Sequence, residues 1–464
     1  MSEKDLNSLL RELPAVHELA ELLQNDHPES PPGAVREACR MAIEEARSTV
    51  VGGGELPSPG RLLENATLQL SSLSASSMTD VINATGVILH TAIGRACLPE
   101  SAVAAVTRVA RGYSVLQWDR ETGRRGHRDI HTERLICQLA GSEAATIANN
   151  NAGATLLVLS ALARGREAVV SRGQLVEIGG SFRIPEVMKQ SGAVMREVGC
   201  TNRTHLRDYR DAINENTAVI LRVHPSNYRI RGFSSEVPLA ELVELGNEFG
   251  IPVVDDLGAG SYIDLKNFGL PSEPTVRESI ETGAAVVTSS GDKLIGGPQA
   301  GIITGKREYI NRIKSHPLAR ALRVGKLTIA ALEASLMLFR EGADYLIRHH
   351  PLYRMFSLSQ AELKGAAEEF ASWLEAPGGC EVKVIETTSY VGSGSLPDHG
   401  IPSFGVGAVT PDNEALALRL RSGDPAVASR IEDGMVKFDM RTLQPEEPRV
   451  LARLLNGALA ELWA

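Results

Sequence analysis

Between about residues 81 and 310, short runs of β-branched residues alternate with amphipathic helical segments, and this pattern constrains the fold more than any other feature of the chain. The runs include residues 168–170, 218–221, 251–254, 285–287 and 301–303. Strands that are separated by helices pair in parallel and bury both faces of their sheet. The sequence therefore predicts an α/β fold with a mostly parallel sheet, whose ligand would bind beyond the carboxyl ends of the strands.

Two further regions flank this alternation. Residues 1–80 show apolar residues at helical spacing, interrupted by Pro- and Gly-rich breaks and followed by a serine-rich stretch near residues 71–77. A long helical stretch at about residues 325–373 leads into a C-terminal region of mixed character. We therefore expect a small N-terminal helical domain at 1–80, a large domain at 81–340 and a smaller C-terminal α/β domain at 341–464.

Composition narrows the classes of protein that fit. With 43% hydrophobic and 23% charged residues the chain is typical of a globular protein, and its net charge of −9 does not indicate a general nucleic-acid binder. Residues 1–80 alone carry a charge of about −7. The five cysteines form no Cys-x-x-Cys pair, so we expect neither a disulfide framework nor a metal site. We see no signal peptide and no apolar run of membrane-spanning length, and we expect a cytoplasmic protein.

Polar residues follow the predicted strands at three places along the chain. Asp255 and Asp256 follow the run that ends at residue 254, and Lys293 lies in the glycine-rich loop that follows Thr288. An asparagine-rich segment at 149–151 precedes a predicted helix. Because the carboxyl ends of parallel strands meet at one edge of a sheet, we expect these groups to lie close together.

These groups match the needs of pyridoxal phosphate. The first turn of a helix offers free backbone N–H groups to a phosphate, and a carboxylate at a strand end can keep the pyridine nitrogen protonated. A lysine amine forms the Schiff base and, once displaced, can act as a base. We choose Asp255 over Asp256 because it directly follows the strand. The predicted cofactor-binding residues are Lys293, Asp255, Asn151, Ala152, Gly153 and Ser290.

Each of these features also has a simpler interpretation. A single lysine in a glycine-rich loop is usually a surface residue, and a pair of aspartates can bind magnesium or cap a helix. The asparagines can be helix caps and nothing more. The loop is not a P-loop, since Gly-x-x-x-x-Gly-Lys-Ser/Thr is absent. The three features together, in this order on one sheet edge, favour the cofactor.

Long runs of residues resemble those of the bacterial L-seryl-tRNA(Sec) selenium transferases, or selenocysteine synthases. The similar runs are residues 13–16, 82–91, 121–126, 176–185, 226–230, 290–293 and 316–324. The resemblance covers nearly the whole chain and is weakest over 30–75 and beyond 340. The chain departs from the family pattern at Ala92-Ile93 and at Pro225, which puts local contacts in doubt but not the chemistry.

The resemblance implies a fold-type I pyridoxal-phosphate-dependent transferase. Such an enzyme converts L-seryl-tRNA(Sec) to L-selenocysteinyl-tRNA(Sec) with selenophosphate, through an aminoacrylyl-tRNA intermediate. By matching position it implies Lys293 as the Schiff-base residue, and Arg95, Arg320 and Arg323 as the residues that bind the anionic selenium donor. Gln174 lies just past a predicted strand and is a further candidate to lie over the cofactor ring, with an ordinary structural role as the favoured alternative. The implied assembly is a homodecameric ring of dimers with active sites at the dimer interfaces, and no membrane is involved.

Two other functions compete with this one. The first is a fold-type I lyase or transferase that acts on a free amino acid or amino sugar, and the second is a catalytically silent tRNA-binding or scaffold protein. The helical region 1–80 favours a tRNA substrate, and we expect it to be the tRNA-binding domain, but its negative charge does not suit a phosphate backbone. Local basic clusters can serve instead. The densest holds Arg120, Arg124, Arg125 and Arg128, for which a solvated loop is an equal alternative.

Overall fold

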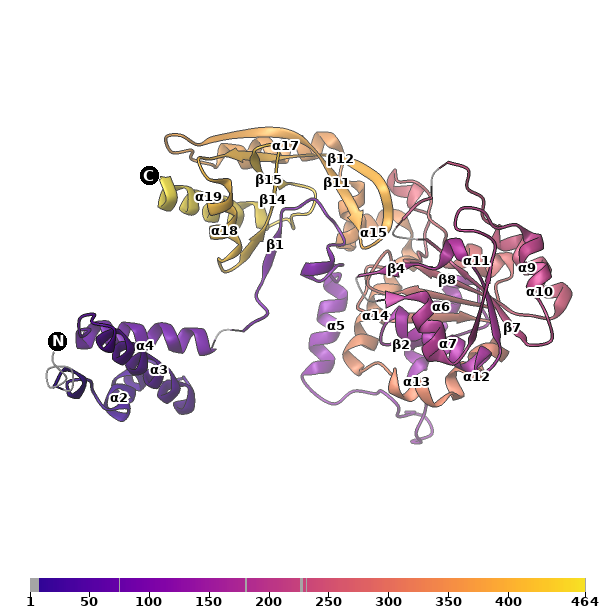
Figure 1. Cartoon of the computed structure of the whole chain (residues 1–464), viewed down its shortest axis with the longest axis horizontal. Helices are drawn as coiled ribbons and strands as arrows, with labels where there is room; N and C mark the ends of the chain where they lie inside the picture. Colours follow the sequence, from indigo (N-terminus) through magenta and orange to yellow (C-terminus); the bar gives the residue numbers. More distant parts are fainter. Residues whose placement is uncertain (1–7, 75, 180–181, 226–227, 231, 464) are drawn as a thin grey trace. The chain divides into compact units, whose positions relative to one another are not determined.

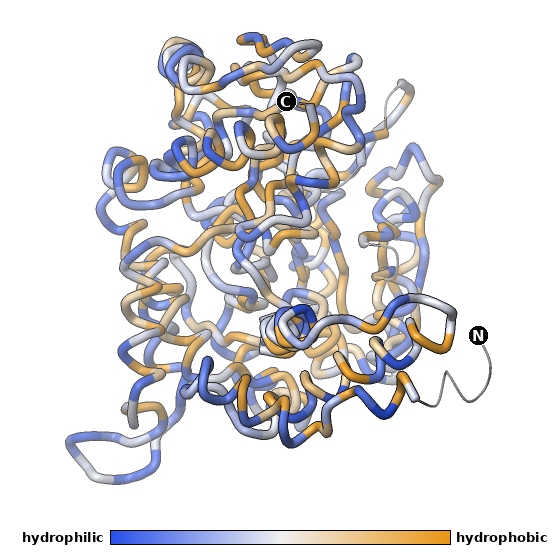
Figure 2. Tube along the Cα trace, turned by 90° about the vertical axis from the view of Figure 1, so that its left-hand side faces the viewer, coloured by the Kyte–Doolittle hydropathy of each residue, from blue (hydrophilic) through white to orange (hydrophobic). Residues whose placement is uncertain are grey.

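The computed structural model describes residues 8–74, 76–179, 182–225, 228–230 and 232–463, and the chain forms two compact units, residues 1–80 and 81–464 (Figure 1). The N-terminal unit contains α2 (Val16–Asp26), α3 (Pro32–Val51) and α4 (Pro59–Ser74). Hydrophobic and hydrophilic residues alternate along the helices (Figure 2). The apolar face of each of the three helices packs into one core, which includes Leu23, Cys39 and Leu62.

The second unit is built around a seven-stranded sheet with the order β2-β10-β9-β8-β7-β3-β6. β10 runs antiparallel to both of its neighbours, and the other pairings are parallel, which confirms the predicted mostly parallel sheet. The strands are β2 (Ala144–Ala148), β3 (Glu167–Ser171), β6 (Val194–Val198), β7 (Thr217–Val223), β8 (Val253–Gly258), β9 (Val286–Ser290) and β10 (Gly301–Gly305).

Helices cover both faces of this sheet, as the alternation predicts. Successive strand residues point to opposite faces, so Val170 and Leu221 pack in one core with α7, α8 and α12, whereas Val169 and Ile220 pack in another with α9 and α10. The helices of this region are α5 (Glu100–Ala110), α6 (Glu133–Ala140), α7 (Asn151–Ala163), α8 (Ile184–Ser191), α9 (Leu206–Ala212), α10 (Leu239–Phe249), α11 (Val276–Thr282), α12 (Arg307–Ser315) and α13 (Pro317–Ala321). A short hairpin, β4 (Glu177–Ile178) with β5 (Phe182–Arg183), follows β3.

The expected long helical stretch at 325–373 is four separate helices. They are α14 (Lys326–Leu338), α15 (Ala343–His349), α16 (Pro351–Ser357) and α17 (Gln360–Ser372). Gly342 has a φ of +84° before α15, Pro351 begins α16, and Ser359 caps α17. Each of these residues favours a helix boundary. The apolar periodicity continues across the boundaries, which is why the sequence predicts one long helical stretch.

The C-terminal region holds a four-stranded antiparallel sheet with the order β11-β12-β15-β14. Its elements are β11 (Glu381–Gly392), β12 (Ser395–Val409), α18 (Asn413–Arg421), β13 (Ala426–Ala428), β14 (Arg430–Glu432), β15 (Met435–Asp439) and α19 (Glu447–Trp463). β1 (Val81–Asn83) pairs in parallel with β13, so the start of the range expected for the large domain is hydrogen-bonded to the C-terminal region. Among the helices described, none is long and apolar enough to cross a membrane.

Candidate functional site

A cavity of about 340 Å³ lies beyond the carboxyl ends of β7, β8 and β9, and we call it the lysine pocket. Residues at or close to the end of each strand face this space, because the parallel strands all finish at the same edge of the sheet. The residues used below are Arg95, Asn151, Ala152, His224, Asp256, Ser290, Asp292 and Lys293, all of which line it. The structure therefore brings together most, but not all, of the predicted site residues.

Lys293 is buried, with 7% of its surface exposed. Burial lowers the pKa of its amine, and the positive charge of Arg95 lowers it further, while Asp256 and Asp292 oppose the shift. A lysine with a lowered pKa is neutral more often, and only the neutral amine attacks an aldehyde. The simpler interpretation of Lys293 as a surface residue is therefore wrong.

Two aromatic side chains hold the loop that carries Lys293: Tyr353 of α16 and His350, the N-cap residue of that helix. The hydroxyl of Tyr353 donates a hydrogen bond to the carbonyl of Leu294 at 2.6 Å, and Nε2 of His350 lies 3.2 Å from the carbonyl oxygen of Ile295. Gly296 has a φ of +67°, and a Cβ on it would lie 2.2 Å from Cε1 of His350. The glycine thus lets the loop lie directly against the histidine ring.

Asp256, and not Asp255, faces the lysine pocket, which corrects our choice between the two. Both residues lie inside β8, so their side chains point to opposite faces of the sheet. Asp255 is fully buried against Nη1 of Arg222 at 2.8 Å and the hydroxyl of Ser279 at 2.7 Å. Asp255 therefore belongs to a buried ion pair that lies outside the lysine pocket.

The carboxylate of Asp256 is held in the pocket by three donors. Nδ2 of Asn151 donates to Oδ1 at 2.9 Å, the amide of Gly258 donates to the same oxygen at 3.1 Å, and the hydroxyl of Thr155 donates to Oδ2 at 3.0 Å. Hydrogen bonds of this kind fix the orientation of a carboxylate. The side chain is positioned to accept a hydrogen bond from a ligand in the pocket.

The N-terminus of α7 supplies two of the three predicted phosphate-binding residues. Asn151 and Ala152 line the pocket, and backbone amides in the first turn of a helix lack acceptors within the helix. Gly153 is different, because its amide donates to Oδ1 of the N-cap residue Asn150 at 2.8 Å. It does not line the pocket, and a Cβ on it would come within 3.1 Å of Leu322. Its role is therefore packing beneath the site.

Two further predicted residues have different positions. Ser290 ends β9 and lines the lysine pocket. Gln174 is buried elsewhere: its Oε1 accepts a hydrogen bond from the amide of Val223 at 3.1 Å, and the residue lines a neighbouring cavity instead. The structure therefore does not bring Gln174 into the pocket.

Sequence reasoning missed His224. It directly follows β7, lines the lysine pocket, and its amide donates to the carbonyl of Asp256 at 2.8 Å. Burial lowers the pKa of its imidazole to about 4, helped by the charges of Arg222 and Arg229, so the ring is neutral at physiological pH. The rule that identified Lys293, a polar residue just after an apolar run, would have found it.

The three predicted donor-binding arginines do not lie together. Nη1 of Arg95 forms an ion pair with Asp292 at 2.5 Å beside Lys293. Arg320 and Arg323 instead line a separate cavity of about 650 Å³, together with Arg125 and Arg128. We call this cavity the arginine pocket.

Comparisons with known proteins identify a family. A family model described as L-seryl-tRNA selenium transferase matches residues 81–444. The chain is 45% identical over 459 residues to the L-seryl-tRNA(Sec) selenium transferase of Moorella thermoacetica, with 97% of each chain covered. It is 41% identical to the enzyme of that name from Aquifex aeolicus, covering 98% of this chain and 100% of the other. Among solved structures, D-glucosaminate-6-phosphate ammonia-lyase has a similar fold, with a TM-score of 0.58 and 20% identity over 83% of this chain and 96% of the other.

Proposed function

The chain belongs to the L-seryl-tRNA selenium transferase family and is a pyridoxal-phosphate-dependent transferase of fold type I, and from this premise we propose that Lys293 carries the cofactor in the lysine pocket. The burial of Lys293 in this pocket, which lowers the pKa of its amine, is the single observation that supports this assignment most strongly. Burying a lysine amine costs free energy, and side chains that are buried in this way with a shifted pKa occur most often at functional sites.

The residues present fit pyridoxal phosphate. The first amides of α7, at Asn151 and Ala152, would hold the phosphate, and Asp256 would hold the proton on the pyridine nitrogen. A volume of about 340 Å³ is within the range of pockets that enclose small ligands. When bound, the cofactor supplies an electron sink for the charge that develops at Cα of the seryl group.

The protein's own groups then act on the substrate. Lys293 takes the proton from Cα and returns it, because its lowered pKa leaves the amine able to accept a proton. The carboxylate of Asp256 would accept a hydrogen bond from the protonated pyridine nitrogen, because Asn151 and Thr155 fix its orientation. Arg95, oriented by Asp292, would bind the anionic selenium donor close to Lys293.

We further propose selenophosphate as the donor and tRNA(Sec) as the carrier of the seryl group. We also propose a homodecameric ring of dimers with active sites at the dimer interfaces. In support, Arg320 and Arg323 do not line the lysine pocket of their own chain, so a second copy would have to supply them. The cytoplasm is the compartment in which charged tRNA is used, and we place the enzyme there.

The direct test is incubation of the purified chain with pyridoxal phosphate, seryl-tRNA(Sec) and selenophosphate. We expect selenocysteinyl-tRNA(Sec), and no turnover of free amino acids or amino sugars. The structural similarity to an ammonia-lyase is a similarity of fold and does not favour the small-molecule alternative. Product formation from a free amino acid, without product from the charged tRNA, would reverse this assignment.

We also propose residues 1–80 as the tRNA-binding domain. The unit has its own core and contains none of the lysine-pocket residues. A chain that lacks residues 1–75 should still bind pyridoxal phosphate but should bind tRNA(Sec) more weakly and discriminate less against ordinary serine tRNA. Titration of both tRNAs at matched salt, with full-length and shortened chains, measures this. Unchanged affinity and selectivity would assign recognition to residues 81–464.

A further inference from the structure

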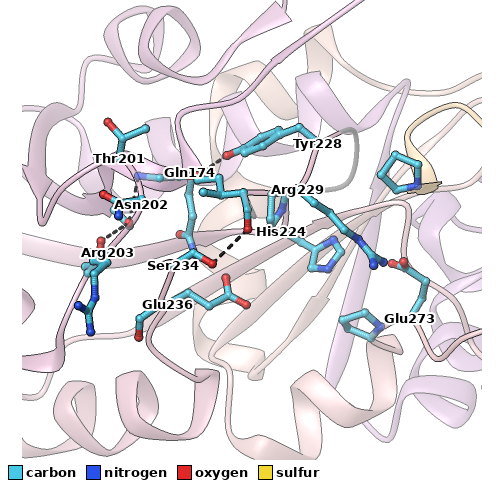
Figure 3. A pocket seen from close by; sticks show the side chains of 18 of the residues that line it. Gln174, Thr201, Asn202, Arg203, His224, Tyr228, Arg229, Ser234, Glu236 and Glu273 are labelled. Carbon is cyan, nitrogen blue, oxygen red and sulfur yellow. Dashed lines mark hydrogen bonds between the residues drawn. The ribbon is translucent and has the colours of Figure 1, made fainter. Parts of the chain in front are cut away.

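A second cavity, of about 400 Å³, adjoins the lysine pocket, and we call it the polar cavity (Figure 3). His224 lines both cavities. The loop after β3 also borders both, since Gln174 lines the polar cavity and Val176 lines the lysine pocket. A ligand that extends out of the lysine pocket past His224 would therefore enter the polar cavity.

The charged groups of the polar cavity balance one another. Arg203 and Arg229 line it, but so do Glu236 and Glu273. The guanidinium of Arg229 points toward the carboxylate of Glu273 (Figure 3), and burial raises the pKa of that carboxyl while Arg229 opposes the rise. A small, highly charged anion such as selenophosphate would meet two acidic side chains here and would leave most of the volume unfilled.

The uncharged groups offer both donors and acceptors. Thr201, Asn202, Ser234 and Ser235 line the cavity, together with the aromatic ring of Tyr228. Gln174 and Tyr228 lie on one side of the cavity and Glu236 on the other (Figure 3). A lining of this kind suits a neutral planar group that carries donors, acceptors and hydroxyls, and the unpaired end of an RNA strand presents such groups.

Some of these walls are fixed by hydrogen bonds. Nδ2 of Asn202 donates to the carbonyl of Phe233 at 2.6 Å, and the hydroxyl of Ser234 donates to the carbonyl of Ile230 at 3.1 Å. The hydroxyl of Tyr228 donates to the carbonyl of Gly173. The cavity is therefore partly formed before a ligand arrives, which reduces the entropy cost of binding.

We propose that the polar cavity binds the 3′-terminal nucleoside of the charged tRNA while the seryl group occupies the lysine pocket. This inference rests on the proposed function. The seryl group is an ester of the terminal ribose, so the site for the nucleoside must open directly beside the site for the amino acid. The polar cavity meets this requirement through His224 and has the lining that a nucleoside needs.

The test pairs protein variants with altered RNA. The substrates are a seryl-charged RNA minihelix with its terminal base and the same minihelix with an abasic terminal residue. The variants are Glu236→Ala and Arg229→Ala, both at exposed residues, and the control is Arg210→Ala, which pairs with Glu248 on the surface and lines neither cavity.

We expect the KM for the intact minihelix to rise about tenfold in Glu236→Ala and Arg229→Ala, which is the size of one lost base contact. The kcat and the absorbance of the bound cofactor should stay close to those of the unmodified chain. The abasic minihelix should show the raised KM with every chain, so the two variants should add little to it. Arg210→Ala should behave as the unmodified chain with both RNAs.

Two results would overturn the inference. One is an unchanged KM for the intact minihelix, and the other is a variant effect that is just as large with the abasic RNA. A change in oligomer mass together with the second result would assign the cavity to a contact between copies of the chain. If the unmodified chain makes no product, the proposed function fails, and titration of uncharged minihelices with and without the terminal base still tests the cavity by itself.

Discussion

The lysine pocket and the arginine pocket hold their charges in different ways. In the lysine pocket, Lys293 and Arg95 lie among Asp256 and Asp292, and the carboxylates are fixed by hydrogen bonds or an ion pair. Arg95 is thus paired with Asp292, and neutral donors of the same chain hold the carboxylate of Asp256 beside Lys293. A pocket of this kind holds reacting groups in position and does not need an external ion to be stable.

The arginine pocket keeps an excess of positive charge. Burial lowers the pKa of Arg128, and the charges of Arg323, Arg125 and Arg320 lower it further. The acidic residues of this pocket pair with Lys314, which also lines it: Lys314 lies 2.8 Å from Glu133 and 3.8 Å from Asp129, so the arginines keep their excess of positive charge. Converging guanidinium groups attract an anion from solution, so this pocket is suited to recruiting a charged partner while the other is suited to chemistry.

The largest expected effect comes from removing the amine of the lysine pocket. Lys293→Ala should eliminate the absorbance of the lysine-bound cofactor and lower turnover by at least about a thousandfold, because the base and the covalent attachment are lost together. Absorbance spectra and a single-turnover assay measure the two effects. A borohydride-reducible link between cofactor and chain that persists in the variant would show that another lysine carries it.

The two aspartates of β8 should separate chemistry from stability. Asp256→Asn should leave the fold intact and lower kcat by about a hundredfold, because an amide does not hold a proton on the pyridine nitrogen. Asp255→Asn should instead lower the free energy of unfolding by about 3 kcal/mol, because Arg222 then stays buried without its counter-charge. Thermal unfolding and kcat are measured for both. The reverse pattern would restore the assignment of Asp255 to the cofactor.

The contrast between these two residues shows how far the sequence can predict the site. Apolar runs and the polar residues after them predict Lys293 and Ser290 at the edge of the sheet, where both line the lysine pocket, because the ends of parallel strands are set by local periodicity. Whether a residue points to one face of the sheet or the other depends on the register of its strand. A continuous run of apolar residues does not reveal that register. Asp255 and Asp256 differ only in this respect.

Positions set by loops and by packing between distant segments were not predictable. Gln174 lies three residues past β3, and its place depends on a hydrogen bond to Val223 that no local pattern indicates. The division of the long helical stretch into four helices was also not predictable. Gly, Pro and Ser are frequent at helix ends but do not always end a helix. Arg320 and Arg323 could be grouped with Arg95 by family resemblance, but their separation within one chain could not be read from the sequence.

Mixed assemblies test whether the two pockets of different copies work together. Arg320→Ala with Arg323→Ala should raise the KM for the selenium donor and lower turnover strongly, while Lys293→Ala is inactive. If the arginine pocket of one copy serves the lysine pocket of another, unfolding and refolding the two inactive chains together should restore activity that neither has alone. Activity that stays at the level of the separate variants would place each complete site within a single chain.

The smallest expected effect is a shift in the pH at which the apoenzyme takes up its cofactor. Arg95 lowers the pKa of Lys293, so Arg95→Ala should raise that pKa, and the unpaired Asp292 would raise it further. Uptake requires the neutral amine, so the rate-against-pH curve should move to higher pH and uptake at neutral pH should slow. Asp292→Asn removes a negative charge and should move the curve in the opposite direction, with Arg210→Ala as the neutral control. Stopped-flow absorbance across neutral to alkaline pH measures all three, and shifts of Arg95→Ala and Asp292→Asn in the same direction would show that the charges beside Lys293 do not control its protonation.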